Sequence, residues 1–238
     1  MAKIGLSKPY FAIYENTAEQ VTYSNGALMG KAVELSIELD NADDNILYAD
    51  NGPAETANVF SGGTVTLTTD DLLPAVMLSV LGVQEEEMTN EAIKTQDPKW
   101  YVWNDMQATP YLGFGAIVKT QNNNKPGFQA VVLPKIKFMN PNDTFNTQGG
   151  TIDWGTPEIS GTIMRSDAAD HPWKVISTIM ESEADAEAAI KQYLQMTPAV
   201  TPPEEATNAA SLAKAGAESI LPNEEKTGGA STKGEAKK

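Results

Sequence analysis

The chain has 238 residues, of which 41% are hydrophobic, enough for one large or two small domains. It contains no cysteine, which excludes disulfides, thiolate nucleophiles and zinc–cysteine sites. The net charge is −15, and residues 1–194 carry 26 acidic and 12 basic side chains, so we do not expect a conventional nucleic-acid binder. The sequence contains no apolar run of about 18 residues, so no membrane span is predicted. No signal peptide is recognisable either, and we therefore expect synthesis in a cytoplasm.

The first elements expected along the chain are short strands at residues 9–14 and 20–23, with Asn25-Gly26 as a hairpin signal before residues 27–29. Residues 31–40 then show a clear period of two. Their apolar positions are Val33, Leu35, Ile37 and Leu39, and their polar positions are Glu34, Ser36, Glu38 and Asp40. This alternation predicts a half-buried strand with one core face and one acidic face.

Turn residues follow that strand, so residues 41–58 are predicted to form a long hairpin with an acidic rim. The β-branched residues 64–69 predict another strand. Residues 72–81 have helical spacing, with Asp70 or Asp71 as the expected N-cap and Gly82 at the end. The resulting expectation is one short helix packed on a sheet.

The second half is predicted to be mostly β. The strands expected there are residues 99–103, 111–120, 128–138 and 156–165, with acidic or polar loops at 84–94 and 140–150. A helix is expected at 183–194, where Ser182 and Asp185 have the spacing of a capping box. From residue 195 the chain is rich in Pro, Ala, Glu and Lys and lacks aromatic residues, which predicts a disordered tail over 195–238.

The sequence lacks complete motifs for dinucleotide binding, calcium binding or catalysis by a Ser-His-Asp triad. Gly113-Phe114-Gly115 lacks the third glycine and the helix of a dinucleotide fingerprint, which favours a packing role in a strand. Residues 40–50 fail the EF-hand spacing in either register, so surface acidity is the preferred interpretation. His171 is the only histidine, which leaves no Ser-His-Asp triad and suggests a local structural role. We therefore expect no enzyme, cofactor or metal site.

A family resemblance begins in residues 31–55, KAVELSIELDNADDNILYADNGPAE. This segment resembles the major tail proteins of bacteriophages with long, non-contractile tails. Further collinear segments resemble the same family: MAKIGLSKPYFAIY, FSGGTVTLTTDDLLPAV, PYLGFGAIVKT, FQAVVLPKIKF, TIDWGTPEISGTIMRSD and HPWK. Together they span residues 1–194, and several matches in order are more specific than one short motif.

The resemblance implies a mainly β fold: a sandwich or open barrel of two sheets with a flanking helix and a C-terminal helix. It also implies hexameric rings of this chain stacked into a tail tube, located in the virion, with tape measure, terminator and distal tail proteins as neighbours. DNA would pass through the lumen without specific binding, and no membrane would be involved. An acidic wall repels phosphate at close range, so the lumen-facing candidates are Glu34, Glu38, Asp40, Asp43 and Asp44.

Contacts between subunits are expected in the 41–58 hairpin and the 140–150 loop, which are long and lack local apolar support. The candidate interface residues are Asn45, Tyr48, Asn51, Phe145 and Trp154. Trp100, Trp103, Trp154 and Trp173 are expected as core or interface anchors. Two alternatives remain open: the inner tube of a contractile injection system or tail-like bacteriocin, and a β-sandwich module that binds carbohydrate or calcium.

Overall fold

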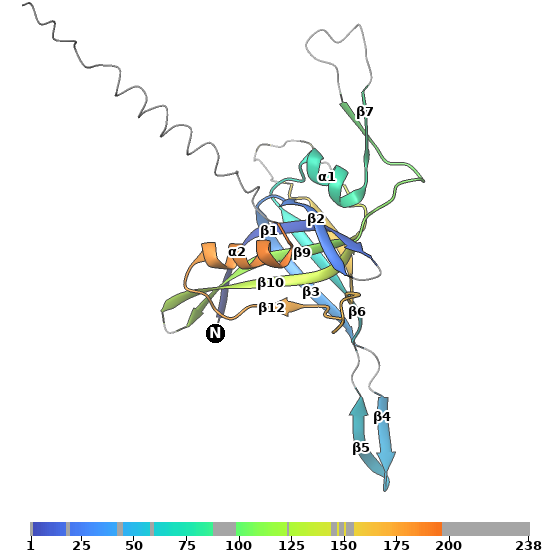
Figure 1. Cartoon of the computed structure of the whole chain (residues 1–238), viewed down its shortest axis with the longest axis vertical. Helices are drawn as coiled ribbons and strands as arrows, with labels where there is room; N and C mark the ends of the chain where they lie inside the picture. Colours follow the sequence, from blue (N-terminus) through green and yellow to red (C-terminus); the bar gives the residue numbers. More distant parts are fainter. Residues whose placement is uncertain are drawn as a thin grey trace, which may run out of the picture. The chain divides into compact units, whose positions relative to one another are not determined.

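The protein is mainly β, as seen in a computed structural model (Figure 1). The structure describes residues 2–17, 20–41, 45–57, 60–87, 99–122, 124–143, 147, 150 and 155–196. These residues belong to one compact unit, Met1–Thr197, and a second unit comprises Pro198–Lys238. The predicted tail, apart from Gln195 and Met196, lies outside the described residues.

Twelve strands and two helices are described in the first unit. The strands are β1 Ala2–Asn16, β2 Val21–Leu28, β3 Ala32–Asn41, β4 Asn45–Ala49, β5 Gly52–Ala57, β6 Phe60–Thr69, β7 Gln84–Glu87, β8 Lys99–Val102, β9 Leu112–Asn122, β10 Lys125–Phe138, β11 Glu158–Met164 and β12 Val175–Ile176. The helices are α1 Pro74–Leu81 and α2 Glu183–Tyr193.

Eight of the strands form one antiparallel sheet in the order β2-β1-β9-β10-β11-β6-β3, with β12 also paired to β10. Strand β10 joins two layers, because Val131 and Val132 pair with β12 whereas residues 135–138 pair with β11. Its register against β9 shifts between Leu133 and Ile136, around Pro134, which has no N–H to donate. The first layer is therefore β2, β1, β9, β12 and the start of β10, and the second is the end of β10 with β11, β6 and β3.

The two layers enclose the main hydrophobic core. Phe11, Leu67, Phe114, Phe138 and Ile159 come from five different strands and are at most 2% exposed. Phe114 and Phe138 meet edge to face, with ring centroids 6.3 Å apart. Strands β1 and β3 are in contact but not hydrogen-bonded, so the sheet closes only partly. The expected mainly β fold, a sandwich or open barrel with a flanking and a C-terminal helix, is confirmed.

Helix α2 covers the outer face of the first layer, where Figure 1 shows it lying beside β9 and β10. Ile190 and Leu194 are fully buried there against side chains of β1, β9 and β10. Glycines make this close approach possible. A Cβ at Gly115 would lie 2.7 Å from Ile190 Cγ2, and one at Gly113 would lie 2.7 Å from Leu194 Cδ2. The expected packing role of this glycine pair is confirmed, although the neighbours it admits include a helix as well as Tyr23 of β2.

The predicted N-cap of α2 is confirmed, whereas the predicted N-cap of α1 is wrong. At α2, the Ser182 hydroxyl accepts the N–H of Asp185 at 3.1 Å, as predicted. At α1, the N-cap is Leu73 with no side-chain cap, so the prediction of Asp70 or Asp71 is wrong. Asp70 instead accepts the N–H of Lys31 at 2.8 Å and anchors the start of β3. Gly82 ends α1 in the left-handed conformation, with φ 71°, as expected.

The Asn25-Gly26 pair is not a hairpin turn, because β2 runs through it without a break. Two residues of β2 lie opposite Ala12 alone, and Asn25 has φ 50°, so the pair forms a β-bulge. An Asn-Gly pair suits a hairpin turn and a β-bulge equally well. A bulge forms here because β2 pairs with β1 on both sides of Asn25-Gly26.

Two hairpins stand as separate two-stranded sheets. Strands β4 and β5 form the expected hairpin, which turns through Asp50 and Asn51 with φ 50° and 65°, the signs of a type I′ turn. Strands β7 and β8 form the other, so the prediction of an irregular loop at 84–94 is wrong for Glu85, Glu86 and Glu87. All three are exposed, which matches the expectation of solvated carboxylates. Most of the predicted 140–150 loop is undescribed or without regular structure.

Candidate assembly surfaces

The outer face of the second layer is polar across three adjacent strands, and we call it the polar sheet face. Each of its rows crosses β3, β6 and β11 through directly paired residues. The rows are Glu34–Thr68–Glu158, Ser36–Thr66–Ser160 and Glu38–Thr64–Thr162. The alternation that places these side chains outward places Val65, Leu67, Ile159 and Ile163 in the core.

Every residue of the polar sheet face is at least partly exposed, and Glu34, Glu38, Glu158 and Thr162 are classed as exposed. Helix α1 contributes to the core and α2 packs on the other layer, so neither helix covers this face. The three rows contain three carboxylates and no basic residue, and the third row continues onto β10 at the exposed Lys137, which pairs with Thr162. The arrangement can therefore present hydroxyls and negative charge to a passing polyanion, which it would repel at close range.

Three of the five lumen-facing candidates fall on or beside this face. Glu34 and Glu38 are exposed members of it, and Asp40 is exposed farther along β3, opposite Gly62. Asp43 and Asp44 lie outside the described residues. Sequence reasoning missed the contribution of β6 and β11. The alternation of threonine with apolar residues in TVTLTT and the pattern EISGTI were the available signals.

The interface candidates gather on the β4–β5 hairpin as far as they are described. Asn45 and Tyr48 lie in β4, and Asn51 is exposed in the turn. Phe145 and Trp154 are outside the described part of the chain. The structure therefore places three candidates on one hairpin and leaves the other two untested.

The tryptophans differ in their surroundings. Trp173 stacks on Phe60, with ring centroids 4.6 Å apart and an interplanar angle of 3°, and packs against the main core. Trp100 and Trp103 are 53% and 44% exposed in and after β8. Trp154 is not described. Trp173 thus has the expected core role, whereas Trp100 and Trp103 remain available for an interface.

A polar network fastens the loop after β11 to the sheet. Lys135 Nζ lies 2.6 Å from Asp167 Oδ2, and the Tyr14 hydroxyl donates to the same oxygen at 2.9 Å. Lys135, and then Tyr14, lower the pKa of Asp167. His171 has φ 47°, and its Nδ1 lies 2.9 Å from the backbone oxygen of Ser166. These contacts give His171 the local structural role expected from the sequence.

A second network fastens α2 to β1 through Glu187. Its carboxylate accepts hydrogen bonds from Tyr10 at 2.7 Å, from Lys191 at 2.5 Å and from Lys8. These donors, with Lys191 the largest contributor, lower the pKa of Glu187 to about 2. The ionised form of Glu187 therefore helps to hold α2 on the outer face of the first layer.

Within the described ranges, no group of three or more potential metal-ligating side chains is found. Neither of the two described helices is long and apolar enough to span a bilayer. No protein-family model matches the sequence, and no curated protein is significantly similar to it.

Proposed function

We propose that this chain is the tail-tube subunit of a bacteriophage with a long, non-contractile tail. Copies assemble into hexameric rings that stack into a hollow tube in the virion, and DNA passes through it without specific binding. Tape measure, terminator and distal tail proteins are the neighbours of the tube. The ordered series of family-like segments over residues 1–194 supports this function, and the mainly β fold is compatible with it.

The single observation that carries the proposal is the polar sheet face. A sheet face left uncovered by either helix and bearing carboxylates and hydroxyls suits the wall of a conduit for a polyanion. Because the Debye length is about 8 Å at physiological salt, such repulsion acts only near the wall, which prevents sticking without barring entry. Enzyme chemistry plays no part in this function.

Assembly is the first property to measure. Sedimentation velocity over a range of protein concentrations, with negative-stain images of the same samples, should show rings or hollow tubes as concentration rises. Class averages of end-on views give the ring symmetry, for which we expect six. A monodisperse monomer at every concentration would contradict the proposal and favour a binding module.

The lumen assignment can be tested separately because the chain lacks cysteine. In a Glu38→Cys variant, the thiol should react with a bulky polymer-linked maleimide before assembly and be protected in intact tubes. Lys125→Cys, at the exposed end of β10 away from the polar sheet face, is the matched control for general loss of reactivity. Equal labelling of Glu38→Cys before and after assembly would remove the lumen assignment while leaving the tube itself standing.

A further inference from the structure

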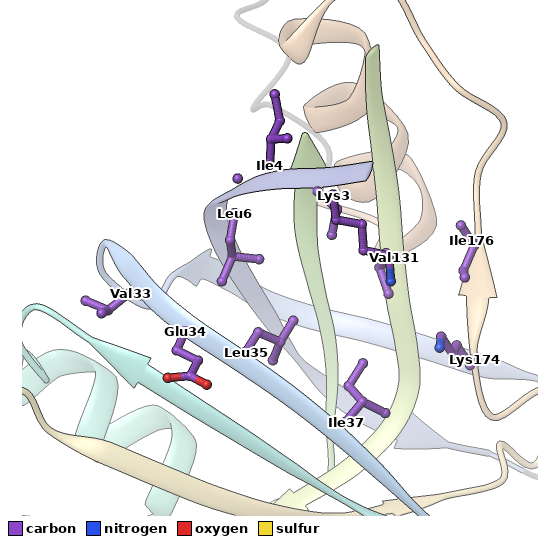
Figure 2. A pocket seen from close by; sticks show the side chains of 12 residues that line it. Lys3, Ile4, Leu6, Val33, Glu34, Leu35, Ile37, Val131, Lys174 and Ile176 are labelled. Carbon is purple, nitrogen blue, oxygen red and sulfur yellow. The ribbon is translucent and has the colours of Figure 1, made fainter. Parts of the chain in front are cut away.

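The inner faces of the two layers remain open to solvent at one end of the fold. The opening is a groove of about 470 Å³ between β1, β3 and the layer that contains β10 and β12, and we call it the inter-sheet groove. Figure 2 shows Leu35 and Ile37 on β3 on the side facing Leu6 and Val131, whereas Glu34 extends from the other side of the strand. The groove therefore continues the apolar core out to the surface.

The rim of the inter-sheet groove exposes three large apolar side chains. Ile4, Val33 and Ile176 line it from three different strands and are 49%, 56% and 49% exposed. In the part of the chain that the structure describes, β3 is hydrogen-bonded to β6 alone and is therefore an edge strand. Exposed apolar side chains beside a free strand edge are the features by which an extended or hairpin segment of a partner is recognised.

Charge selects the kind of partner. Two basic residues, Lys3 and Lys174, line the groove, and the one acidic residue of the lining, Glu34, extends its side chain from the other face of β3. This local excess of positive charge occurs in a chain whose net charge is −15. An apolar segment with carboxylates and no basic residue is therefore the complementary occupant.

The β4–β5 hairpin of the chain itself has this chemistry. Residues 45–57 contain the apolar run Ile46-Leu47-Tyr48 and two acidic residues, Asp50 and Glu55, with no basic residue. Among the described residues, β4 and β5 are hydrogen-bonded only to each other, and an isolated two-stranded hairpin is marginally stable in water. A partner surface would stabilise it.

The groove and the hairpin lie at opposite ends of β3, so a contact between the groove of one copy and the hairpin of another would join unlike ends. The groove lies at Val33, Leu35 and Ile37 of β3, whereas the hairpin follows the other end of the strand, at Asn41. The intervening four to eight residues of extended chain span roughly 13–26 Å. A surface that differs from the surface it binds makes a heterologous contact, which can repeat without limit from one copy to the next.

We propose that the inter-sheet groove receives the β4–β5 hairpin of a second copy, joining copies head to tail. The proposal rests on the proposed function, because it requires that the chain polymerise. Lys3 and Lys174 face the carboxylates of the incoming hairpin, and its apolar side chains complete the open end of the core.

Cross-linking between single-cysteine variants tests this contact directly. Val33→Cys and Ala49→Cys replace exposed residues of the groove and the hairpin, and Ala75→Cys, exposed on α1, is the control. A mixture of the first two variants, treated with a short bismaleimide under assembling conditions, should yield a mixed dimer at several times the level of the Val33→Cys and Ala75→Cys mixture. An equal yield in the two mixtures would overturn the proposal, and so would cross-links from Val33→Cys that map outside residues 45–57.

Charge reversal gives an independent readout. Lys3→Glu should weaken self-association at least tenfold at low salt, whereas Lys125→Glu, which makes the same change at an exposed position that does not line the groove, should have little effect. Equal association of the two variants would contradict the role of Lys3. Failure of the wild-type chain to associate would contradict the proposed function, whereas tubes that form without the mixed cross-link would overturn only the hairpin contact.

Discussion

The contact between Gly115 and Ile190 offers a sharp test of how α2 is held on the sheet. The Gly115→Ala substitution adds a methyl group 2.7 Å from Ile190 Cγ2 and 3.6 Å from Val132 Cγ2. Both neighbours belong to a buried cluster, so neither can move freely. Overpacking of this kind costs about 1–3 kcal/mol of the free energy of unfolding.

The partner substitution removes the clashing atom. Ile190→Ala alone should destabilise the protein by about 2–5 kcal/mol, because Ile190 is fully buried and leaves a cavity. In the double variant, the new methyl group at position 115 enters space vacated by Ile190. We therefore expect the double variant to be less destabilised than the sum of the single variants, by about 1–3 kcal/mol.

Urea unfolding followed by circular dichroism measures all three free energies, provided that the slopes of the transitions agree. Gly155→Ala is the matched control, since a Cβ there would meet nothing within 4 Å, and it should change stability by less than about 0.5 kcal/mol. Additive effects of Gly115→Ala and Ile190→Ala would refute the reasoning that the glycine exists to admit α2.

Three further outcomes follow from the described contacts. The pKa of Glu187 is lowered from 4.5 to about 2, so the stabilisation that its ionised form gives is present above about pH 4.5 and is lost as the pH falls towards 2. Between pH 5 and pH 2, the wild type should therefore lose more free energy of unfolding than the Glu187→Gln variant does. Urea midpoints measured over this pH range check the difference. Removal of residues 198–238 should leave the melting temperature and tube formation unchanged, whereas truncation before Ser182 deletes α2 and should lower stability by several kcal/mol in the same melting assay. Glu34→Lys combined with Glu38→Lys should change stability little, because both side chains are exposed, but should increase retention of DNA by assembled tubes in a filter-binding assay.

The sequence predicts best those elements whose period agrees with their tertiary surroundings. Strand β3 was predicted within one residue at each end, because Val33 to Leu39 alternate without interruption. Helix α2 was equally clear from its Ser182 cap and apolar face. Both signals are local, and the packing of each element reinforces them.

The errors arise where a local signal has two structural solutions. An Asn-Gly pair suits a tight turn or a bulge, and only the pairing of β2 along β1 decides between them at Asn25. An aspartate before a helix can cap it or hold a neighbouring strand, and Asp70 holds Lys31. The three carboxylates of β7 carry no apolar alternation, so only their pairing with β8 reveals a strand.

The polar sheet face was only partly predictable for a similar reason. Glu34 and Glu38 could be assigned to an outward face from β3 alone. Their alignment with Thr68 and Thr64 depends on the register between β3 and β6, which no local pattern contains. A row of side chains across three strands is a property of the sheet, and it becomes visible only when the strand order is known.

Strand β3 contributes to both the polar sheet face and the inter-sheet groove, because its alternate side chains point to opposite sides of the sheet. A slip of one residue would turn Glu34 and Glu38 into the groove and Leu35 and Ile37 out to the wall, destroying both at once. The structure opposes such a slip at both ends of the strand. Asp70 accepts the N–H of Lys31 at 2.8 Å and donates its own N–H to the Lys31 carbonyl at 3.0 Å, while the Ser61 hydroxyl donates to the carbonyl of Asp40 at 2.5 Å. Fixing the ends of one edge strand thus preserves the proposed lumen wall and the proposed docking site together.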